Sequence, residues 1–153
     1  MFETLEDQAR PRISQVSVFL ENRLGALLGV ARVLEEQQVN VWGMSITDAA
    51  DHAIVRLVVD RPTMAVAALQ AAGHHLMESE LIAVVLPAGR VGGMSRLLKA
   101  LLMAELNVNY MYAFVPGTAG QRAAVAVHVE DAERAATALV ESGLVLVGQD
   151  ELR

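Results

Sequence analysis

The sequence predicts an α+β protein made of two successive units, each with the element order β-α-β-β-α-β. Three observations lead to this fold class: the chain repeats itself, each copy alternates between strand-like and helix-like hydrophobic periods, and 54% of its residues are hydrophobic. Only 20% of the residues are charged, so each copy has enough apolar side chains for a core. A length of 153 residues is compatible with one ordinary domain or two small ones, and the repeat favours two.

The repeat becomes visible when the sequence is moved along itself by 67 positions. After Met44 the offset grows to 70, because the turn-rich segment 116–120 is longer than its equivalent, 48–51. Loops tolerate insertions better than core elements, so a change of length confined to this turn indicates a duplicated unit. The residues that coincide include Gly25 with Gly92, Val30 with Leu97, Leu34 with Leu101, Asn40 with Asn107, and Gly73 with Gly143.

Each element follows from a local pattern. The first strand, at 13–20, alternates between two sets of residues and is rich in β-branched residues. The first helix has leucines at helical spacing from Leu24 to Leu34, and the second is bounded by Asp60 as a cap, Pro62 in its first turn and Gly73 as its end. In the first copy we expect a strand at 13–20, a helix at 24–38, strands at 39–47 and 52–59, a helix between Asp60 and Gly73, and a strand within 74–79. In the second copy we expect a strand at 81–87, a helix at 91–105, strands at 106–115 and 122–129, a helix at 131–142, and a strand at 144–149.

This order of elements predicts how the copies fold and pair. In the ferredoxin-like arrangement, both helices cover one face of a four-stranded antiparallel sheet. A single copy of about 70 residues has a thin core and leaves one sheet face and its edges open. We therefore expect the two copies to pair edge to edge as one pseudo-symmetric unit. The predicted division is an N-terminal tail at 1–12, a first domain at 13–79 and a second domain at 80–153.

The junction between the first strand and the first helix carries a recognisable motif. It reads Phe-Leu-Glu-Asn-Arg-Leu-Gly-Ala-Leu over 19–27, and Val-Asn-Val follows at 39–41. This pattern resembles the ACT domain, and the second copy is similar to a weaker version of it, so that the two copies cover 13–149. The segment 107–114 resembles tandem ACT proteins that carry no attached enzyme. The resemblance implies a protein that binds an amino acid and transmits its occupancy to enzymes of amino-acid metabolism.

The sequence departs from the family pattern at four positions. The family proline is Leu24 in the first copy and Val91 in the second, and Gly89 stands where the first copy has Asn22. A histidine found in some serine-sensing members is Leu20 here.

The chemistry of the motif also suits an amino-acid ligand. The start of the first helix offers unpaired N–H groups and the positive end of a dipole to a carboxylate, and Gly25 lets the backbone come close. The side-chain oxygen of Asn22 can accept from the ammonium, and Asn40 can add a second polar contact. The predicted ligand-binding residues are Asn22, Arg23, Leu24, Gly25, Ala26, Leu27 and Asn40 in the first copy, and Val91, Gly92, Gly93, Met94 and Asn107 in the second.

The resemblance also implies that each loop faces the second strand of the other domain. The Asn22 loop would then face Asn107, and the Gly89 loop would face Asn40. An alternative interpretation is that Asn22 and Gly25 form only a helix cap and a tight turn, and that Asn40 and Asn107 occupy turn positions.

Composition excludes several other functions. A net charge of −6 with a single lysine leaves no basic patch for nucleic acid, and the chain has no cysteine for disulfides, thiolate metal sites or nucleophilic catalysis. No apolar stretch reaches the roughly 18–20 residues that span a bilayer, and the N-terminus lacks the pattern of a signal peptide, so we expect a cytoplasmic protein that does not bind membranes. Neighbouring histidines at 74–75 point to opposite faces of a strand, so we expect no metal site and no cofactor there.

Four functional hypotheses remain. The first is a stand-alone amino-acid sensor, and the second is a regulatory subunit of an amino-acid biosynthetic enzyme similar to the acetolactate synthase small subunit. An enzyme is disfavoured, because no Ser-His-Asp context or pair of carboxylates on a cleft wall is evident. A purely structural dimer module is the fourth. The helix at 94–103 is apolar over more than one stripe, which favours a homodimer or a partner-enzyme surface. The alternative is that this helix packs against the other copy within one chain.

Overall fold

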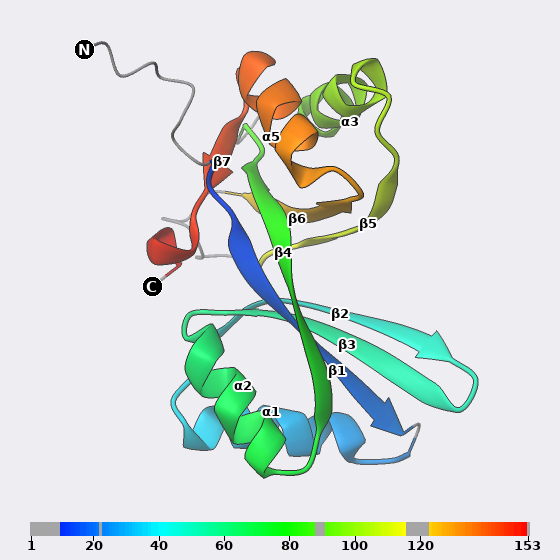
Figure 1. Ribbon diagram of the computed structural model, residues 1–153, viewed down its shortest axis with the longest axis vertical. Coiled ribbons are helices and arrows are strands. Elements are labelled where there is room, and N and C mark those ends of the chain that lie inside the picture. Colours follow the sequence, from blue (N-terminus) through cyan, green and yellow to red (C-terminus); the bar gives the residue numbers. More distant parts are fainter. Residues whose placement is uncertain (1–9, 22, 88–90, 116–122, 153) are drawn as a thin grey trace.

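A computed structural model describes residues 10–21, 23–87, 91–115 and 123–152, and the predicted tandem βαββαβ fold is confirmed (Figure 1). Among the described residues, no helix is long and apolar enough to cross a membrane. In chain order, the elements are β1 (Ile13–Glu21), α1 (Ala26–Glu36), β2 (Val41–Ala49), β3 (His52–Val59), α2 (Pro62–Ala71), β4 (His75–Val85), α3 (Gly93–Met103), β5 (Val108–Ala113), β6 (Ala124–Val129), α5 (Ala132–Glu141), β7 (Val145–Val147) and the short 3₁₀ helix η1 (Gln149–Glu151).

The strands follow the ferredoxin-like order in both copies. All pairs are antiparallel, in the order β2-β3-β1-β4-β6-β5, and β7 also pairs with β4. The first copy therefore reads β2-β3-β1-β4, and the second reads β5-β6-β4-β7. Strand β4 is both the last strand of the first copy and the first strand of the second.

The continuity of β4 corrects one prediction. We expected separate strands at 74–79 and 81–87, but the chain runs without a break from His75 to Val85. Its partner changes from β1 to β6 between Leu81 and Ile82, and the predicted domain division at 79–80 falls inside the strand. The physical reason is that no glycine, proline or asparagine interrupts 75–85, so nothing forces a turn. The last predicted strand, at 144–149, is shorter than expected, because η1 begins at Gln149.

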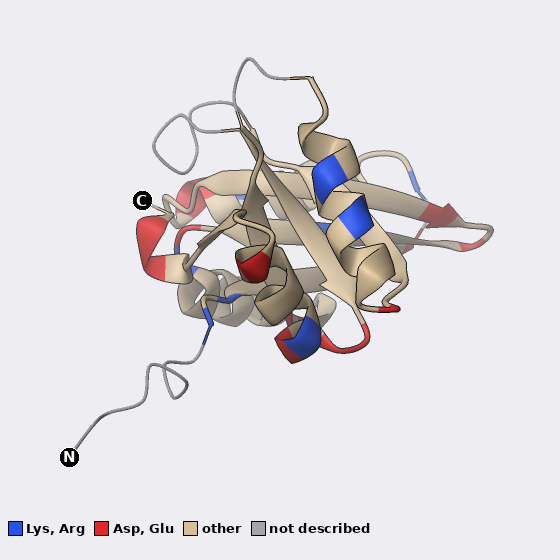
Figure 2. Ribbon diagram, turned by 90° about the horizontal axis from the view of Figure 1, so that it is seen from above, with Lys and Arg blue, Asp and Glu red and all other residues tan. Residues whose placement is uncertain are grey.

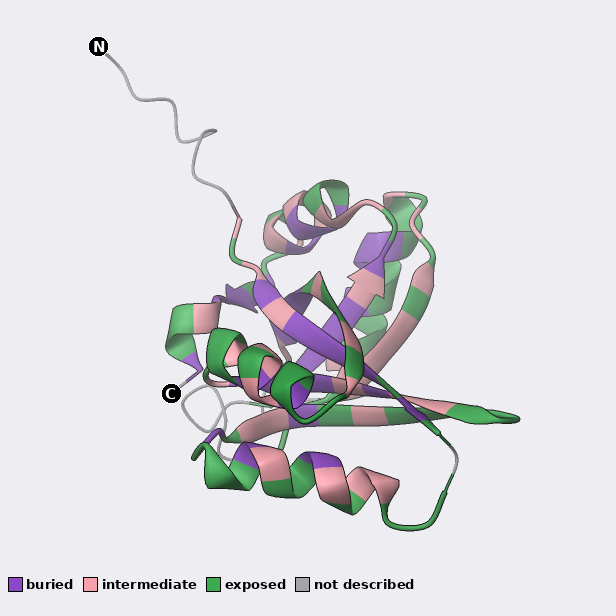
Figure 3. Cartoon of the chain, turned by 60° about the horizontal axis from the view of Figure 1, so that its bottom comes forward, coloured by how far each residue is buried: buried purple, intermediate pink, exposed green. Residues whose placement is uncertain are grey.

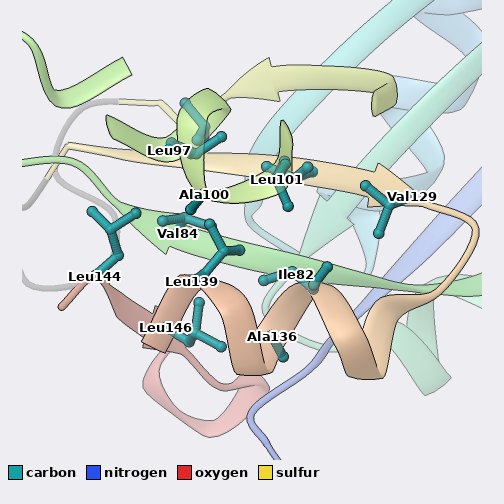
Figure 4. Packing of buried hydrophobic residues seen from close by; sticks show 13 residues of the cluster. Ile82, Val84, Leu97, Ala100, Leu101, Val129, Ala136, Leu139, Leu144 and Leu146 are labelled. Carbon is teal, nitrogen blue, oxygen red and sulfur yellow. The ribbon is translucent and has the colours of Figure 1, made fainter. Parts of the chain in front are cut away.

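Each copy has its own core between its sheet and its two helices (Figures 3 and 4). In the second copy, α3 and α5 contribute Leu97, Leu101 and Leu139, which pack on the strand residues Ile82 and Val84. The first copy is built alike from α1, α2 and the helix-facing residues of β1 and β3. The buried residues of that first core are Val16, Val18, Leu20, Val30, Leu34, Val39, Val55, Leu57, Val59, Ala65 and Leu69.

A third cluster joins the two copies, and we call it the seam. It lies between the sheet faces that the helices leave uncovered, and Val115 also donates to the carbonyl of Trp42 where β2 and β5 meet. Its buried apolar members are Ile13, Val58, Leu81, Ala83, Phe114, Ala124, Ala126, Val147 and Leu152. The copies are thus joined both through a shared strand and face to face.

Gln15 is a buried polar side chain at the seam. Its amide nitrogen donates to the hydroxyl of Tyr110 at 2.7 Å and to Ser79 Oγ at 3.0 Å, and its oxygen accepts from the hydroxyl of Tyr112 at 2.7 Å. Burial, and secondarily Tyr110, raises the pKa of Tyr112, so this hydroxyl stays protonated and able to donate. Gln15 comes from the first copy and both tyrosines from the second, so this network fixes how the two sheets meet.

His128 makes the stability of the seam depend on pH. Its ring stacks on that of Tyr110 with 4.6 Å between the centroids, and its Nδ1 lies 3.2 Å from Asn109 Oδ1. The guanidinium of Arg56 lies over the Tyr110 ring, 4.0 Å from the centroid. Burial first, and Arg56 second, lower the pKa of His128 below its ordinary value of 6.5. The unfolded chain therefore binds this proton more tightly than the folded chain does.

The sign of the pH effect follows from that difference. The contribution of His128 to stability is complete above the unfolded pKa of 6.5 and is lost as the pH falls through the lower folded value. We expect a His128→Asn variant to lose less free energy of unfolding than the parent between about pH 7.5 and about pH 5, measured by urea denaturation. Equal losses in parent and variant would contradict this role for His128.

Candidate functional site

The predicted corner before α1 is a tight left-handed turn. Gly25 has φ +85°, which side chains rarely adopt, although a Cβ there would meet nothing within 4 Å. The need for glycine is therefore conformational and not steric. Ala26 N–H donates to the carbonyl of Arg23 at 3.3 Å, while the N–H groups of Leu27 and Leu28 have no backbone acceptor among the described residues. The start of α1 thus offers donors to an anion.

A pocket of about 740 Å³ opens beside this corner. One wall is the end of β1 and the corner itself, the floor is the side of α1 that carries Gly29 and Val33, and the far wall is the turn between α2 and β4. All of its lining residues belong to the first copy: Phe19, Leu20, Glu21, Arg23, Leu24, Gly25, Ala26, Gly29, Val33, Ala72, Gly73, His74 and His75.

Charged groups of both signs border this pocket. Glu21 and Arg23 are exposed at the corner, His75 is exposed and His74 is half-buried on the opposite wall. Within the part of the chain that the structure describes, neither Glu21 nor Arg23 forms an ion pair. Both charges remain available for a small zwitterion, one for each of its poles.

The structure brings together only part of the predicted site. Arg23, Leu24, Gly25 and Ala26 line the pocket, and Leu27 is half-buried against the first core. Asn22 lies outside the described residues. Sequence reasoning missed Glu21, Gly29, Gly73, His74 and His75 as lining residues. Glu21 adjoins the motif and could have been included, but nothing local in the sequence indicates that the turn after α2 faces the corner.

The two predicted strand asparagines lie elsewhere. Asn40 is held by Asp60: its backbone N–H donates to Oδ1 at 2.9 Å and its Nδ2 donates to Oδ2 at 3.0 Å. Asn40 lines a separate hollow of about 390 Å³ at the other end of α1. Asn107 is exposed just before β5 and does not line the pocket at the corner. The predicted crossing of each loop to the other domain's asparagine stays a prediction.

Comparison with known proteins decides the family. The sequence matches the family described as the ACT domain pair over residues 12–153. The chain belongs to this family. No match is found among curated proteins.

Solved structures share the fold of this ACT domain pair. A protein from Bacteroides thetaiotaomicron superposes with a TM-score of 0.84 at 25% identity, covering 93% of this chain and 96% of that one. The regulatory subunit of aspartate kinase from Thermus thermophilus has a TM-score of 0.60 at 16% identity, covering 88% and 93%. The corresponding subunit from Thermus flavus has a TM-score of 0.56 at 14% identity, covering 88% and 94%.

The second ACT domain repeats the corner with different surroundings. Gly92 has φ +98°, matching Gly25, and α3 begins at Gly93. A Cβ on Gly93 would lie 3.2 Å from Cδ of Pro87, so this corner packs closely on the residues that follow β4. Val91 is fully exposed and Met94 is partly exposed. The described corner residues of the two domains therefore share backbone geometry, while the side chains around them differ.

Proposed function

We propose that this ACT domain pair is a regulatory protein without catalytic activity that binds an amino acid in the pocket beside Gly25. The observation that carries the proposal is that the guanidinium of Arg23 and the carboxylate of Glu21 line one cavity at the start of α1. A volume of about 740 Å³ lies within the range of roughly 300–1,000 Å³ that is typical of small-molecule sites.

The two poles of an amino acid match this lining. The ligand carboxylate accepts hydrogen bonds from the first turn of α1 and forms an ion pair with Arg23. The ligand ammonium forms an ion pair with Glu21. Leu20, Val33 and the two glycines of the floor and the far wall offer apolar space for a side chain. Family membership supports this proposal, because the resemblance implies amino-acid binding at the corner after the first strand.

Strand β4 provides a route from the pocket to the second domain. It begins at His75 on the pocket wall, and its other end carries Val84 into the core of the second domain. A ligand that contacts this wall differently in two arrangements of the domains binds one arrangement more tightly than the other. The difference between the two affinities sets how far the populations of the two arrangements shift. Occupancy of the pocket is thereby conveyed to a partner that distinguishes the two arrangements.

The proposal is tested by measuring the melting temperature of the chain with each of the twenty amino acids. A ligand at 100 times its Kd stabilises the fold by about 2.7 kcal/mol, which is readily seen. We expect Arg23→Gln and Glu21→Gln to reduce this shift, since each removes the partner of one ligand pole. Arg32→Gln and Glu36→Gln are matched controls, because both residues are exposed on α1 and neither lines the pocket. No shift with any amino acid, or equal losses in the controls, would refute the proposal.

A second candidate function is that of a subunit bound to an amino-acid biosynthetic enzyme. The favouring observation is the exposed apolar stripe of α3, formed by Met94, Leu98 and Leu102, which are 39%, 42% and 73% exposed. The spacing of four residues places them on one side of a helix whose charged residues are both basic (Figure 2). Light scattering on the purified chain separates the two cases: a homodimer favours a sensor that self-associates, whereas a monomer that co-purifies with an enzyme favours the subunit.

A further inference from the structure

We propose that only the first ACT domain keeps this pocket open, and that Arg96 closes the equivalent pocket in the second. This inference rests on the proposed function for the identity of the ligand, but the closing itself is a property of the fold. It assigns one amino-acid site to each chain and names the residue that removes the other.

The repeat identifies the equivalent positions. Gly29 of α1 corresponds to Arg96 of α3, because each directly precedes the first buried residue of its helix, Val30 and Leu97. The glycine that ends the second helix of each domain corresponds as well, Gly73 with Gly143. The same pair of structural positions therefore faces each other in both domains, once as glycine with glycine and once as arginine with glycine.

The space between these positions is open in the first domain. A Cβ built on Gly29 or on Gly73 meets no atom within 4 Å, and both residues line the pocket. The open space between the helix and the turn after α2 is therefore created by the absence of two side chains.

The same space is occupied in the second domain. Nη2 of Arg96 donates to the carbonyl of Ser142 at 2.6 Å, and a Cβ built on Gly143 would lie 2.7 Å from that nitrogen. The guanidinium thus lies directly over the turn between α5 and β7. The hydrogen bond to the carbonyl gives this position of the side chain a specific partner, which a ligand would have to displace.

Other described residues of the second domain agree with a closed pocket. A hollow of about 390 Å³ borders Arg96, Ala100 and Ser142, but its lining includes none of the corner residues 91–94. The two histidines of the first pocket are replaced by Leu144, which is buried, and Val145. Among its described residues, the second domain therefore has neither the two open glycine positions nor the two histidines of the first pocket.

A thiol-accessibility experiment tests the closing without any ligand. The chain has no cysteine, so single substitutions report cleanly. Ala72 and Ser142 are equivalent C-terminal cap residues with nearly identical backbone angles, φ −80° and −79°. We expect the thiol of Ser142→Cys to react with a maleimide several-fold more slowly than that of Ala72→Cys, and to react several-fold faster when Arg96→Gly is added. An unchanged rate on adding Arg96→Gly would overturn the inference.

Calorimetry tests the consequence for binding. Any of the twenty amino acids that raises the melting temperature of the unmodified chain is titrated, and we expect one site per chain. Gly29→Arg should abolish that site, while Gly29→Ala should retain it because a methyl group leaves the pocket open. Arginine at the equivalent position of α3 shows that this fold accommodates it. Two sites per chain, or unaffected binding to Gly29→Arg, would overturn the inference while leaving the proposed function standing. If no amino acid binds, the proposed function fails, and the maleimide reaction rates of the Ser142→Cys variants still test whether Arg96 covers this turn.

Discussion

Replacing Leu34 or Leu101 by alanine should each lower the free energy of unfolding of the whole chain by about 2–5 kcal/mol. The two residues are equivalent in the repeat, come from α1 and α3, and are 2% and 1% exposed. Each deletion removes buried methyl groups and leaves a cavity that the surrounding side chains fill only in part.

The two variants also test whether the domains unfold together. Because β4 belongs to both sheets and the seam buries residues of both domains, we expect one unfolding transition that either substitution shifts as a whole. Urea denaturation followed by circular dichroism measures it. Leu28→Ala is the control on α1, since Leu28 is 54% exposed, and it should change stability far less. If the chain shows two separate transitions and each substitution shifts only one of them, the shared strand does not couple the domains.

Replacing Gln15 by leucine should destabilise the chain by about 1–3 kcal/mol, the cost of leaving buried polar groups without a partner. The substitution removes the acceptor of the Tyr112 hydroxyl and the donor to Tyr110 and Ser79. Gln15 is fully buried, so water does not readily replace these bonds.

A double-mutant cycle isolates the contribution of this bond across the seam. If the loss comes from an orphaned hydroxyl, Gln15→Leu combined with Tyr112→Phe should be less destabilised than the sum of the two single variants, because the group left unpaired is also gone. Chemical denaturation of the four proteins gives the coupling energy. Strictly additive losses would mean that Gln15 matters through its packing and not through Tyr112.

The elements of the fold were largely predictable from local patterns. The offset between copies, the alternation in β1, and the leucine spacing of α1 together predict two βαββαβ units, which the structure confirms. The prediction of two strands around residue 80 was wrong, because a strand that ends one sheet and begins another has the same local pattern as two short strands.

The candidate site was predictable only where it is contiguous in sequence. The corner from Arg23 to Ala26 lines the pocket, and a glycine before an amphipathic helix is a local signal in the sequence; that this corner binds a ligand stays a prediction. His74 and His75 could not be assigned to it, because they approach the corner only when α2 packs beside α1. Asn40 was expected to contact the ligand, but the structure shows its amide bonded to Asp60; whether it also contacts a ligand stays a prediction.

By itself, the amino-acid sequence determined the duplication, the order of helices and strands, and the two glycine corners, because periodicity and turn signals act over a few neighbouring residues. Only the tertiary structure decided that β4 is shared, that Gln15 joins two tyrosines across the seam, and that Gly29 faces Gly73 where Arg96 covers Gly143. These contacts link residues from about 40 to 100 positions apart, and such pairs meet only when whole elements pack, which no local pattern encodes.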